Sequence, residues 1–364
     1  MEGRPVHKFY VDSLEEILGY VNKIGKMCQD GGVMKPLWFR GQEYSHFNLS
    51  PNIFRGAKYH YNDKKTYSNN HLREDYRYQH FMSRNFDKTD YREPRSVFEW
   101  QEIMQHFFSK TRLMDWSESL FVALEFALEG FMIPYKNLEI SEKRHKMQPT
   151  LWILQPNKLN CQVYESLLEN SFSVLEQVLQ DMKSEEKERI CEELEKNRDI
   201  YFSLEDGGEQ NFGNIVSLTA LRDLKRSYAG WDKSALLRME LNPYFYLLLR
   251  IYADGVPVKS GTMPPLAVIH PYHSHRIRVQ KGVFTVFPYY IPGDREAMID
   301  SAGIKMNPMS MEYMAKCQDA LYEIYLTNPE KIAAQMRQMG CKSSDLYPDT
   351  QRVAQDMENM DFTV

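Results

Sequence analysis

QHFFSKTRLMDWSESLFVALEFALEG, at residues 105–130, specifies the fold more strongly than any other part of this sequence. Its first half packs a Gln-His pair, a Thr-Arg pair and an Asp-Trp-Ser triplet into a short span. Its second half is rich in Ala and apolar residues, which predicts a helix over residues 119–128 that Gly130 stops. Polar groups this dense beside a buried helix must satisfy one another or face a cleft.

The overall composition is that of a folded chain. Its 364 residues suffice for one large domain or two ordinary ones, and 13% of them are aromatic. The net charge of -5 gives no electrostatic case for generic binding to nucleic acid or anionic membranes. It does not exclude a local basic cleft. We find no apolar run near the ~20 residues of a membrane helix and no signal-peptide core. We therefore expect a cytoplasmic protein without a membrane segment.

The cysteines and histidines lack the spacing of a metal site. Five scattered cysteines without a CxxC pair are typical of reduced thiols in a cytosolic protein: Cys28, Cys161, Cys191, Cys317 and Cys341. His270, His273 and His275 cluster, but histidines at this spacing in a loop are a weak metal signal. We predict no metal site.

The predicted elements alternate without a regular βαβ rhythm. Helices are expected at residues 11–24, 71–86, 96–108, 119–128, 215–224, 234–241, 311–324 and 329–339, and strands at 37–40, 151–154, 266–269 and 276–288, the last with a bulge or turn at Gly282. This order favours an α+β fold: a small mixed or antiparallel sheet core surrounded by helices, with a helical insertion and a helical C-terminal tail. The sequence has no GxGxxG or GxxxxGK[ST] motif, hence no dinucleotide fingerprint and no P-loop.

Residues 163–198 differ in texture from the rest of the chain. They are rich in Glu, Lys, Leu and Met with helical periodicity, and Lys187 is one of several charged residues expected on a solvated face. An amphipathic helical hairpin packed on one side explains this pattern. A surface that binds a protein partner is the alternative.

Arg40 is the first candidate for a functional residue. It follows two aromatic residues on a predicted strand, and Gly41 permits close approach of another backbone. An Arg at a strand end can hold phosphate or carboxylate through a bidentate fork, and Gln42 adds an amide beside it. The alternative is a buried Arg that pairs with Asp115 or a nearby Glu.

Two further groups of polar residues are candidates. His106 titrates near neutral pH, although a His beside Phe107 and Phe108 is also typical of a core. The first group surrounds it: Gln105, His106, Thr111, Arg112, Asp115 and Ser117. Arg112 and Asp115, three residues apart, are expected to pair, or Asp115 or Ser117 caps the helix that begins near Ser119, whose N-terminus is itself an anion site. The second group shares one face of the predicted late strand: Arg276, Arg278 and Gln280.

Three segments together carry a resemblance to a known family. WFRGQ at 38–42, QHFFSKTRLMDWSESLFVALEFA at 105–127 and RIRVQKGVF at 276–284 resemble, in order, the recurring elements of the FRG domain, a mostly bacterial family named for its Phe-Arg-Gly motif. Phe108 and Lys110 depart from the Gly and Pro frequent in that family, so its Gly-Pro turn is lost. The matching positions are Arg40, Gln105, His106, Thr111, Arg112, Asp115, Arg276 and Gln280.

The resemblance also implies a domain organisation. An FRG-type domain is expected over residues 1–290, with its core at 11–156 and 261–290 and a helical insertion at 157–260. Residues 291–364 are expected to form a helical C-terminal tail packed on the same domain.

The same order of motifs is similar, more distantly, to that of Arg-specific ADP-ribosyltransferases. On this resemblance Arg40 holds a phosphate of NAD, and Ser117 or Asp115 supports the nicotinamide side. Gln280 stands near the position of the catalytic Glu. Because Gln cannot carry a negative charge, either His106 or a Glu elsewhere substitutes for it, or the chain binds a nucleotide without this chemistry.

We therefore predict a polar cleft that acts on NAD or a related nucleotide, with NAD as a substrate and no firmly expected cofactor. The catalytic candidates are His106, Asp115 and Gln280, and the ligand-binding candidates are Arg40, Gln42, Gln105, Thr111, Arg112, Ser117 and Arg276. The alternative is a non-catalytic module that binds a phosphorylated ligand or RNA, in phage defence or a toxin system, with a protein partner at residues 163–198. A third interpretation is a buried polar network that only specifies the fold.

Overall fold

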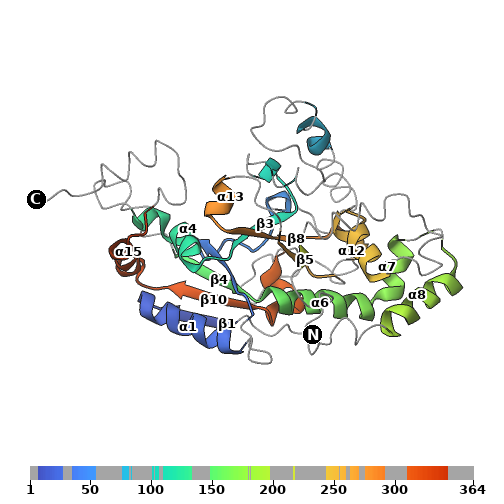
Figure 1. Ribbon diagram of the computed structural model, residues 1–364, viewed down its shortest axis with the longest axis horizontal. Coiled ribbons are helices and arrows are strands. Elements are labelled where there is room, and N and C mark those ends of the chain that lie inside the picture. The colour runs from blue at the N-terminus through green and yellow to red at the C-terminus, as the bar shows by residue number, and fades with distance from the viewer. Residues whose placement is uncertain are drawn as a thin grey trace, which may run out of the picture.

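The structure is a computed structural model. It describes residues 7–27, 35–54, 76–81, 83, 101, 103–105, 110–132, 148–178, 180, 182–196, 216–217, 243–253, 255–259, 263–269, 275–291 and 310–342. These residues form a mixed sheet of eight strands in the order β1-β10-β4-β2-β3-β8-β7-β5, with helices around it (Figure 1). The predicted α+β fold is confirmed, and the sheet is larger than the small one expected.

The strands of the main sheet come from the whole length of the chain. They are β1 (His7–Val11), β2 (Trp38–Gln42), β3 (Leu113–Ser117), β4 (Thr150–Leu154), β5 (Val216–Ser217), β7 (Leu266–Ile269), β8 (Gly282–Val286) and β10 (Leu321–Leu326). The pairs β1–β10 and β5–β7 are parallel, and the other neighbours are antiparallel. A second, two-stranded sheet joins β6 (Val258–Lys259) to β9 (Tyr290–Ile291).

Helices cover the sheet in two separate hydrophobic clusters. The first packs α1 (Leu14–Met27), α4 (Leu120–Met132) and α15 (Pro329–Gln338) against β1, β10, β4 and β2. Figure 1 shows these three helices toward one end of the molecule. The second cluster includes residues of α6 (Pro156–Glu169), α7 (Ser171–Val178), α8 (Ser184–Lys196) and α12 (Pro243–Leu248). A π-helical turn (Leu249–Ala253) continues α12.

Gly41 allows strand β2 and helix α4 to touch. A Cβ atom at this position would lie 1.8 Å from the backbone oxygen of Ala123 and 2.6 Å from the backbone nitrogen of Ala127. Only glycine leaves room for the helix there. The predicted close approach is confirmed, and the approaching backbone belongs to α4.

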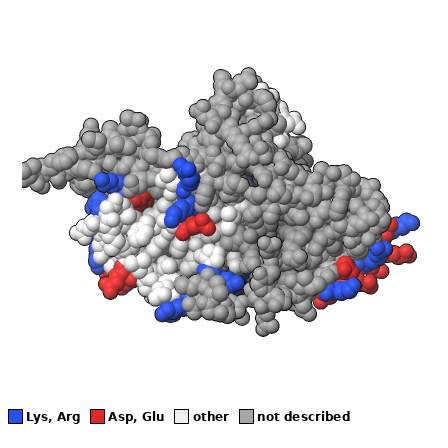
Figure 2. Space-filling view, viewed as in Figure 1, with Lys and Arg blue, Asp and Glu red and all other residues white. Residues whose placement is uncertain are grey.

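The described residues of the segment 163–198 belong to three helices, and two of them, α7 and α8, pack on each other. α6 runs from the middle of the molecule toward one end, where α7 and α8 lie, and acidic and basic side chains gather at that end (Figures 1 and 2). Lys187 was expected on the solvated face, which is wrong: its side chain is 4% exposed and its Nζ lies 2.5 Å from Oε1 of Glu176. Because α7 packs on α8, the side of α8 that carries Lys187 faces protein instead of water. A role for these helices in binding a protein partner stays a prediction.

Several predicted elements are corrected by the structure. The helix expected at 311–324 is a 3-10 turn (Met311–Tyr313) and a short helix α14 (Ala315–Gln318), followed by strand β10. Arg276 and Arg278 belong to a short helix, α13 (His275–Val279), and the strand begins only at Gly282. Two residues of the helix expected at 215–224 form β5. Gly130 lies inside α4 and does not stop it.

Other predicted elements are confirmed or lie outside the described residues. The helices at 11–24 and 329–339 and the strands at 37–40, 151–154 and 266–269 are present with shifted ends. The described residues of the helices expected at 71–86 and 96–108 are helical, and the helix at 234–241 falls outside the described part. Within that part, no helix is both long and apolar enough to cross a bilayer.

Candidate functional site

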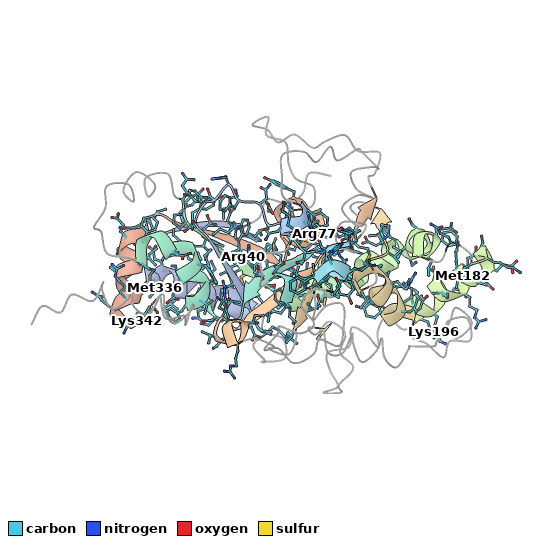
Figure 3. The ribbon with its side chains drawn as sticks, turned by 90° about the horizontal axis from the view of Figure 1, so that it is seen from above. Arg40, Arg77, Met182, Lys196, Met336 and Lys342 are labelled. Atoms are coloured by element: carbon cyan, nitrogen blue, oxygen red, sulfur yellow. The ribbon has the colours of Figure 1, made fainter. Side chains whose placement is uncertain are left out.

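The candidate site is a cavity of about 310 Å³, here called the Arg40 pocket. It is formed by β2, β3, β8, α4, α13 and the 3-10 turn η1 (Asn52–Phe54). The described residues that line it are Phe39, Arg40, Gly41, Asn52, Gln105, Asp115, Trp116, Ser117, Ala123, Phe126, Arg276, Ile277, Gln280, Gly282 and Phe284. Figure 3 places Arg40 near the middle of the molecule, between Met336 toward one end and Lys196 toward the other. The three sequence segments that carry the family resemblance therefore meet at one cavity.

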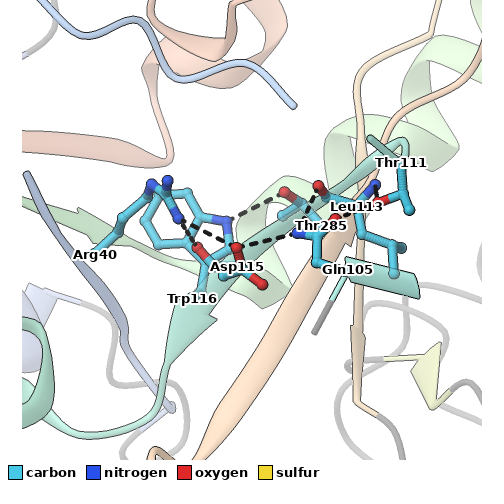
Figure 4. Close-up of polar contacts among 7 residues, drawn as sticks. All are labelled: Arg40, Gln105, Thr111, Leu113, Asp115, Trp116 and Thr285. Carbon is cyan, nitrogen blue, oxygen red and sulfur yellow. Dashed lines mark hydrogen bonds and ion pairs between the residues drawn. The ribbon is translucent and has the colours of Figure 1, made fainter. Parts of the chain in front are cut away.

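Arg40 connects two strands that hardly pair. β2 and β3 share a single pair in register, Phe39 with Ser117. Beyond it, Nη1 of Arg40 donates to the backbone oxygen of Asp115 at 2.6 Å and lies 3.9 Å from Oδ2 of the same residue (Figure 4). Its buried Nε has no hydrogen-bond partner among the described residues. The guanidinium thus replaces a missing ladder contact and keeps donor capacity for a ligand.

The charged guanidinium of Arg40 is partly desolvated. Its side chain is only 18% exposed. Burial lowers the pKa of Arg40, and the nearby Asp115 carboxylate partly offsets this. An Arg stays protonated in proteins even so, which leaves a cation with little water around it. Such a group gains much from an anionic ligand.

Asp115 is held from a second side by Gln105. The side-chain amide of Gln105 donates to Oδ2 of Asp115 at 3.0 Å and to the backbone oxygen of Leu113 at 3.1 Å (Figure 4). The buried hydroxyl of Thr111 donates to the side-chain oxygen Oε1 of Gln105, which fixes the orientation of that amide. Asp115 itself is 57% exposed and lines the pocket. The result is a carboxylate fixed in place but open to solvent.

Ser117 joins β3 to the turn that follows α13. Its hydroxyl donates to the backbone oxygen of Gln280 at 2.7 Å and accepts from the backbone N–H of Ser119 at 3.0 Å. Because α4 begins only at Leu120, this contact with Ser119 lies before the helix, and the expected capping of the helix by Asp115 or Ser117 stays a prediction. Lys281, next in the turn, has a φ of 45°, a conformation that costs a residue with a side chain roughly 1–2 kcal/mol. Helix α13 carries Arg276 to the pocket wall, and this turn carries Gln280 there.

Three predicted ligand-binding residues do not line the pocket. Gln42 is buried and accepts from the indole N–H of Trp152 at 2.9 Å. Thr111 is buried and acts through Gln105. Arg112 is buried and donates to the backbone oxygens of Phe287 and Tyr252. Its guanidinium carbon lies 4.5 Å from the centre of the Tyr289 ring.

The expected pairing of Arg112 with Asp115 is also wrong. Spacing of three brings side chains together on a helix, but here the chain is extended from Leu113 onward, and residues three apart in a strand point to opposite faces. Asp115 contacts Arg40 and Gln105 instead. The alternative expected for Arg40 was a buried Arg that pairs with Asp115. Arg40 does contact Asp115, and both residues also line the pocket.

The structure adds lining residues that sequence reasoning missed. Asn52 and Phe126 both line the pocket. Asn52 follows Pro51 in the LSPNIFRG segment, where a polar residue in an apolar turn was the available signal. His106 lies outside the described residues, so its predicted role stays a prediction. In the described part, no group of three or more His, Cys, Asp or Glu residues has the arrangement of a metal site.

Comparison with known proteins gives one similarity. No curated protein and no solved structure matches the chain. A family model does match, over β2, β3 and α4, which supply Arg40, Asp115 and Ser117 to the pocket. The part of the chain at residues 35–132 matches the family model of the FRG domain, which supports assignment of this segment to the FRG family.

Proposed function

We propose that the Arg40 pocket binds a phosphorylated, nucleotide-like ligand. The observation that carries the proposal is the convergence of two arginines, Arg40 and Arg276, on one cavity from segments far apart in the chain. Asp115 is the one carboxylate among the described lining residues, so these residues sum to a positive charge. Arginine forks hold phosphate through paired hydrogen bonds, and the desolvated setting strengthens them.

The remaining lining groups suit the rest of such a ligand. Asn52, Gln105 and Gln280 bring amide groups to the wall, while Phe126 and Phe284 bring apolar surface. Ligand pockets commonly combine a mostly apolar lining with a few polar groups in volumes of roughly 300–1,000 Å³. The Arg40 pocket lies at the small end of that range, which favours a mononucleotide or one half of a dinucleotide. The first turn of α4, which contributes Ala123, adds the positive end of a helix dipole.

Two arginines on the same short helix provide a matched test. Arg276 lines the pocket, whereas Arg278 is exposed and is not a lining residue. Isothermal titration of AMP, ADP and NAD into the wild-type chain should show binding to at least one of them. We expect Arg276→Ala to weaken that binding about tenfold or more and Arg278→Ala to leave it nearly unchanged. Equal effects of the two variants would argue for nonspecific attraction, and an absence of binding to all three would reject the proposal.

Turnover of NAD is a second candidate, favoured by the carboxylate of Asp115 in the pocket. ADP-ribosyl transfer breaks the bond between ribose C1′ and the nicotinamide nitrogen, and a nearby carboxylate stabilises the oxocarbenium-like charge that develops. Gln280 is neutral, so Asp115 would have to supply this charge. Nicotinamide release, followed by chromatography in the wild type and in Asp115→Asn, separates turnover from binding. Binding of NAD without nicotinamide release would favour a non-catalytic binding module over an enzyme that consumes NAD.

A further inference from the structure

The two oxygens of the Asp115 carboxylate stand in different surroundings. Both protein donors approach the same oxygen: Nε2 of Gln105 at 3.0 Å and Nη1 of Arg40 at 3.9 Å from Oδ2. Among the described residues nothing donates to Oδ1. The side chain is 57% exposed and lines the Arg40 pocket. One carboxylate oxygen is thus anchored, and the other is available to a ligand.

Among the groups of an organic ligand, a hydrogen-bond donor suits the available oxygen. An ionised carboxylate accepts hydrogen bonds and donates none, and it repels the oxygens of a phosphate. A ligand that places its phosphate against Arg40 or Arg276 must therefore turn a different group toward Asp115. In a nucleotide the groups with a donor near the phosphate are the ribose hydroxyls, and an Asp or Glu that accepts from a ribose hydroxyl is a general solution for this contact.

The layer behind Asp115 holds the carboxylate ready for that contact. Thr111 orients the Gln105 amide so that its N–H₂ group faces Asp115 and its carbonyl faces away. The second hydrogen of that amide is used by the backbone oxygen of Leu113. Because each group in the chain Thr111–Gln105–Asp115 has one assigned direction, the carboxylate is preorganised rather than free to rotate (Figure 4).

We propose that Asp115 is a specificity-determining residue that accepts a hydrogen bond from a ribose hydroxyl of the ligand, so that the pocket selects nucleotides that carry this hydroxyl over those that lack it. Thr111 and Gln105 are positioning residues for it. The inference rests on the proposed function of the pocket, and it narrows the substrate class from a phosphorylated ligand to a phosphorylated ribose.

The test compares three probes on the same protein: AMP, 2′-deoxy-AMP and 3′-deoxy-AMP. We expect the wild-type chain to bind AMP about tenfold or more tightly than at least one deoxy form, since a hydrogen bond to a charged group is lost. Asp115→Asn should bring the affinities to within about twofold of one another, because it removes the charge while keeping an oxygen for Gln105. Glu192→Gln, an exposed acid on α8, removes the same charge far from the pocket and should keep the wild-type preference.

The possible outcomes separate this inference from the proposed function. Equal affinity of the wild type for all three probes, with binding still lost in Arg276→Ala, would overturn the ribose contact and leave the phosphate site intact. Absence of binding to AMP, ADP and NAD in a folded wild-type chain would overturn both, and if only ADP or NAD binds, the same comparison is made with the deoxy forms of that nucleotide. If Asp115→Asn fails to fold, the preference of the wild type decides, and Thr111→Val, which unlocks Gln105, should reduce that preference without abolishing AMP binding.

Discussion

Gly41 illustrates how a single residue sets the geometry of the site. Its absent side chain lets α4 lie directly on β2, and a Cβ atom would meet backbone atoms that cannot rotate away. We expect Gly41→Ala to lower the free energy of unfolding by about 3 kcal/mol or more, because relief requires a shift of the whole helix. Urea-induced unfolding followed by circular dichroism measures this.

A second glycine supplies the control. Gly19 is exposed on α1, and a Cβ there would meet nothing within 4 Å. Gly19→Ala should raise stability by up to about 1 kcal/mol, since Ala is the better helix former. Similar, small effects of both substitutions would show that β2 and α4 do not touch in this way.

Arg112 shows what a motif cannot reveal about a residue. The Thr-Arg-x-x-Asp spacing made Arg112 a candidate ligand residue, yet it is buried against backbone carbonyls and an aromatic ring. Nothing in the sequence distinguished Arg112 from Arg40, because which face of a strand points to the pocket depends on its partners. Arg40 lines a cavity, and so do five other candidates: Gln105, Asp115, Ser117, Arg276 and Gln280.

Truncation of Arg112 should lower the stability of the protein rather than its affinity for the ligand of the pocket. Arg112→Ala removes the donor to two backbone carbonyls and the contact with Tyr289, so we expect a loss of about 3 kcal/mol in unfolding free energy. Arg112→Ala should still bind the ligand of the pocket at temperatures where it is folded. The reverse result, a stable protein that no longer binds, would return Arg112 to the site.

At the scale of elements, the sequence predicted best where a pattern was long. The helices near residues 14–27 and 329–338 repeat apolar residues over several turns, and both are present. The five residues of α13 were read as a strand, because over so short a span alternation and helical spacing look alike. Strand β10 was read as a helix because helix formers precede it, and pairing on both sides overrides that preference.

Strand β10 also carries a buried acid whose titration can be tested. Burial raises the pKa of Glu323 above its ordinary value of 4.5, while contacts with Tyr325 and Lys8 oppose the shift. Folding therefore favours the protonated acid, and this contribution to stability is lost as the pH rises through the raised pKa. Lys8, the partner of Glu323 at 3.4 Å, is half exposed and can be solvated by water.

We expect Glu323→Gln to stabilise the protein at neutral pH relative to wild type. The advantage should shrink as the pH falls through the raised pKa of the folded state and be gone below about 4.5, where the wild-type side chain is protonated in both states. Thermal unfolding of both proteins between about pH 4 and pH 8 gives the difference, with the exposed Glu192→Gln as the control. A variant that is less stable at neutral pH would mean that the ion pair with Lys8 outweighs the cost of burial.

At the scale of the whole molecule, the family match covers a shorter part of the chain than the sheet does. The family match ends at residue 132, whereas the sheet draws strands from His7 to Leu326. The pocket too needs Arg276 and Gln280, far beyond the matched part. Sequence motifs pointed to several residues that line the pocket, because dense polar residues beside an apolar helix are recognisable locally. They could not give the strand order, which depends on contacts between distant segments.

The strand order sets a testable limit on how the chain can be divided. The domain predicted from the sequence ends at residue 290, with residues 291–364 as a helical tail packed on it, but this tail contains strand β10, which lies between β1 and β4 in the sheet (Figure 1). α15 follows and buries Ile332, Ala333 and Met336 in the same cluster as α1 and α4. A chain of residues 1–290 would therefore leave β1 without its partner and expose an edge of β4 together with apolar surface.

We expect the chain of residues 1–290 to lose cooperative unfolding and to aggregate, whereas residues 1–342, which retain every described element, should unfold much like the full chain. Near-ultraviolet circular dichroism reports packed aromatic side chains, and analytical ultracentrifugation reports association. Protection of β4 amides from hydrogen exchange is the most local measure, since β10 pairs with this strand along its length. Cooperative unfolding of residues 1–290 at the midpoint of the full chain would contradict the sheet order, because a domain missing an interior strand cannot keep the stability of the intact one.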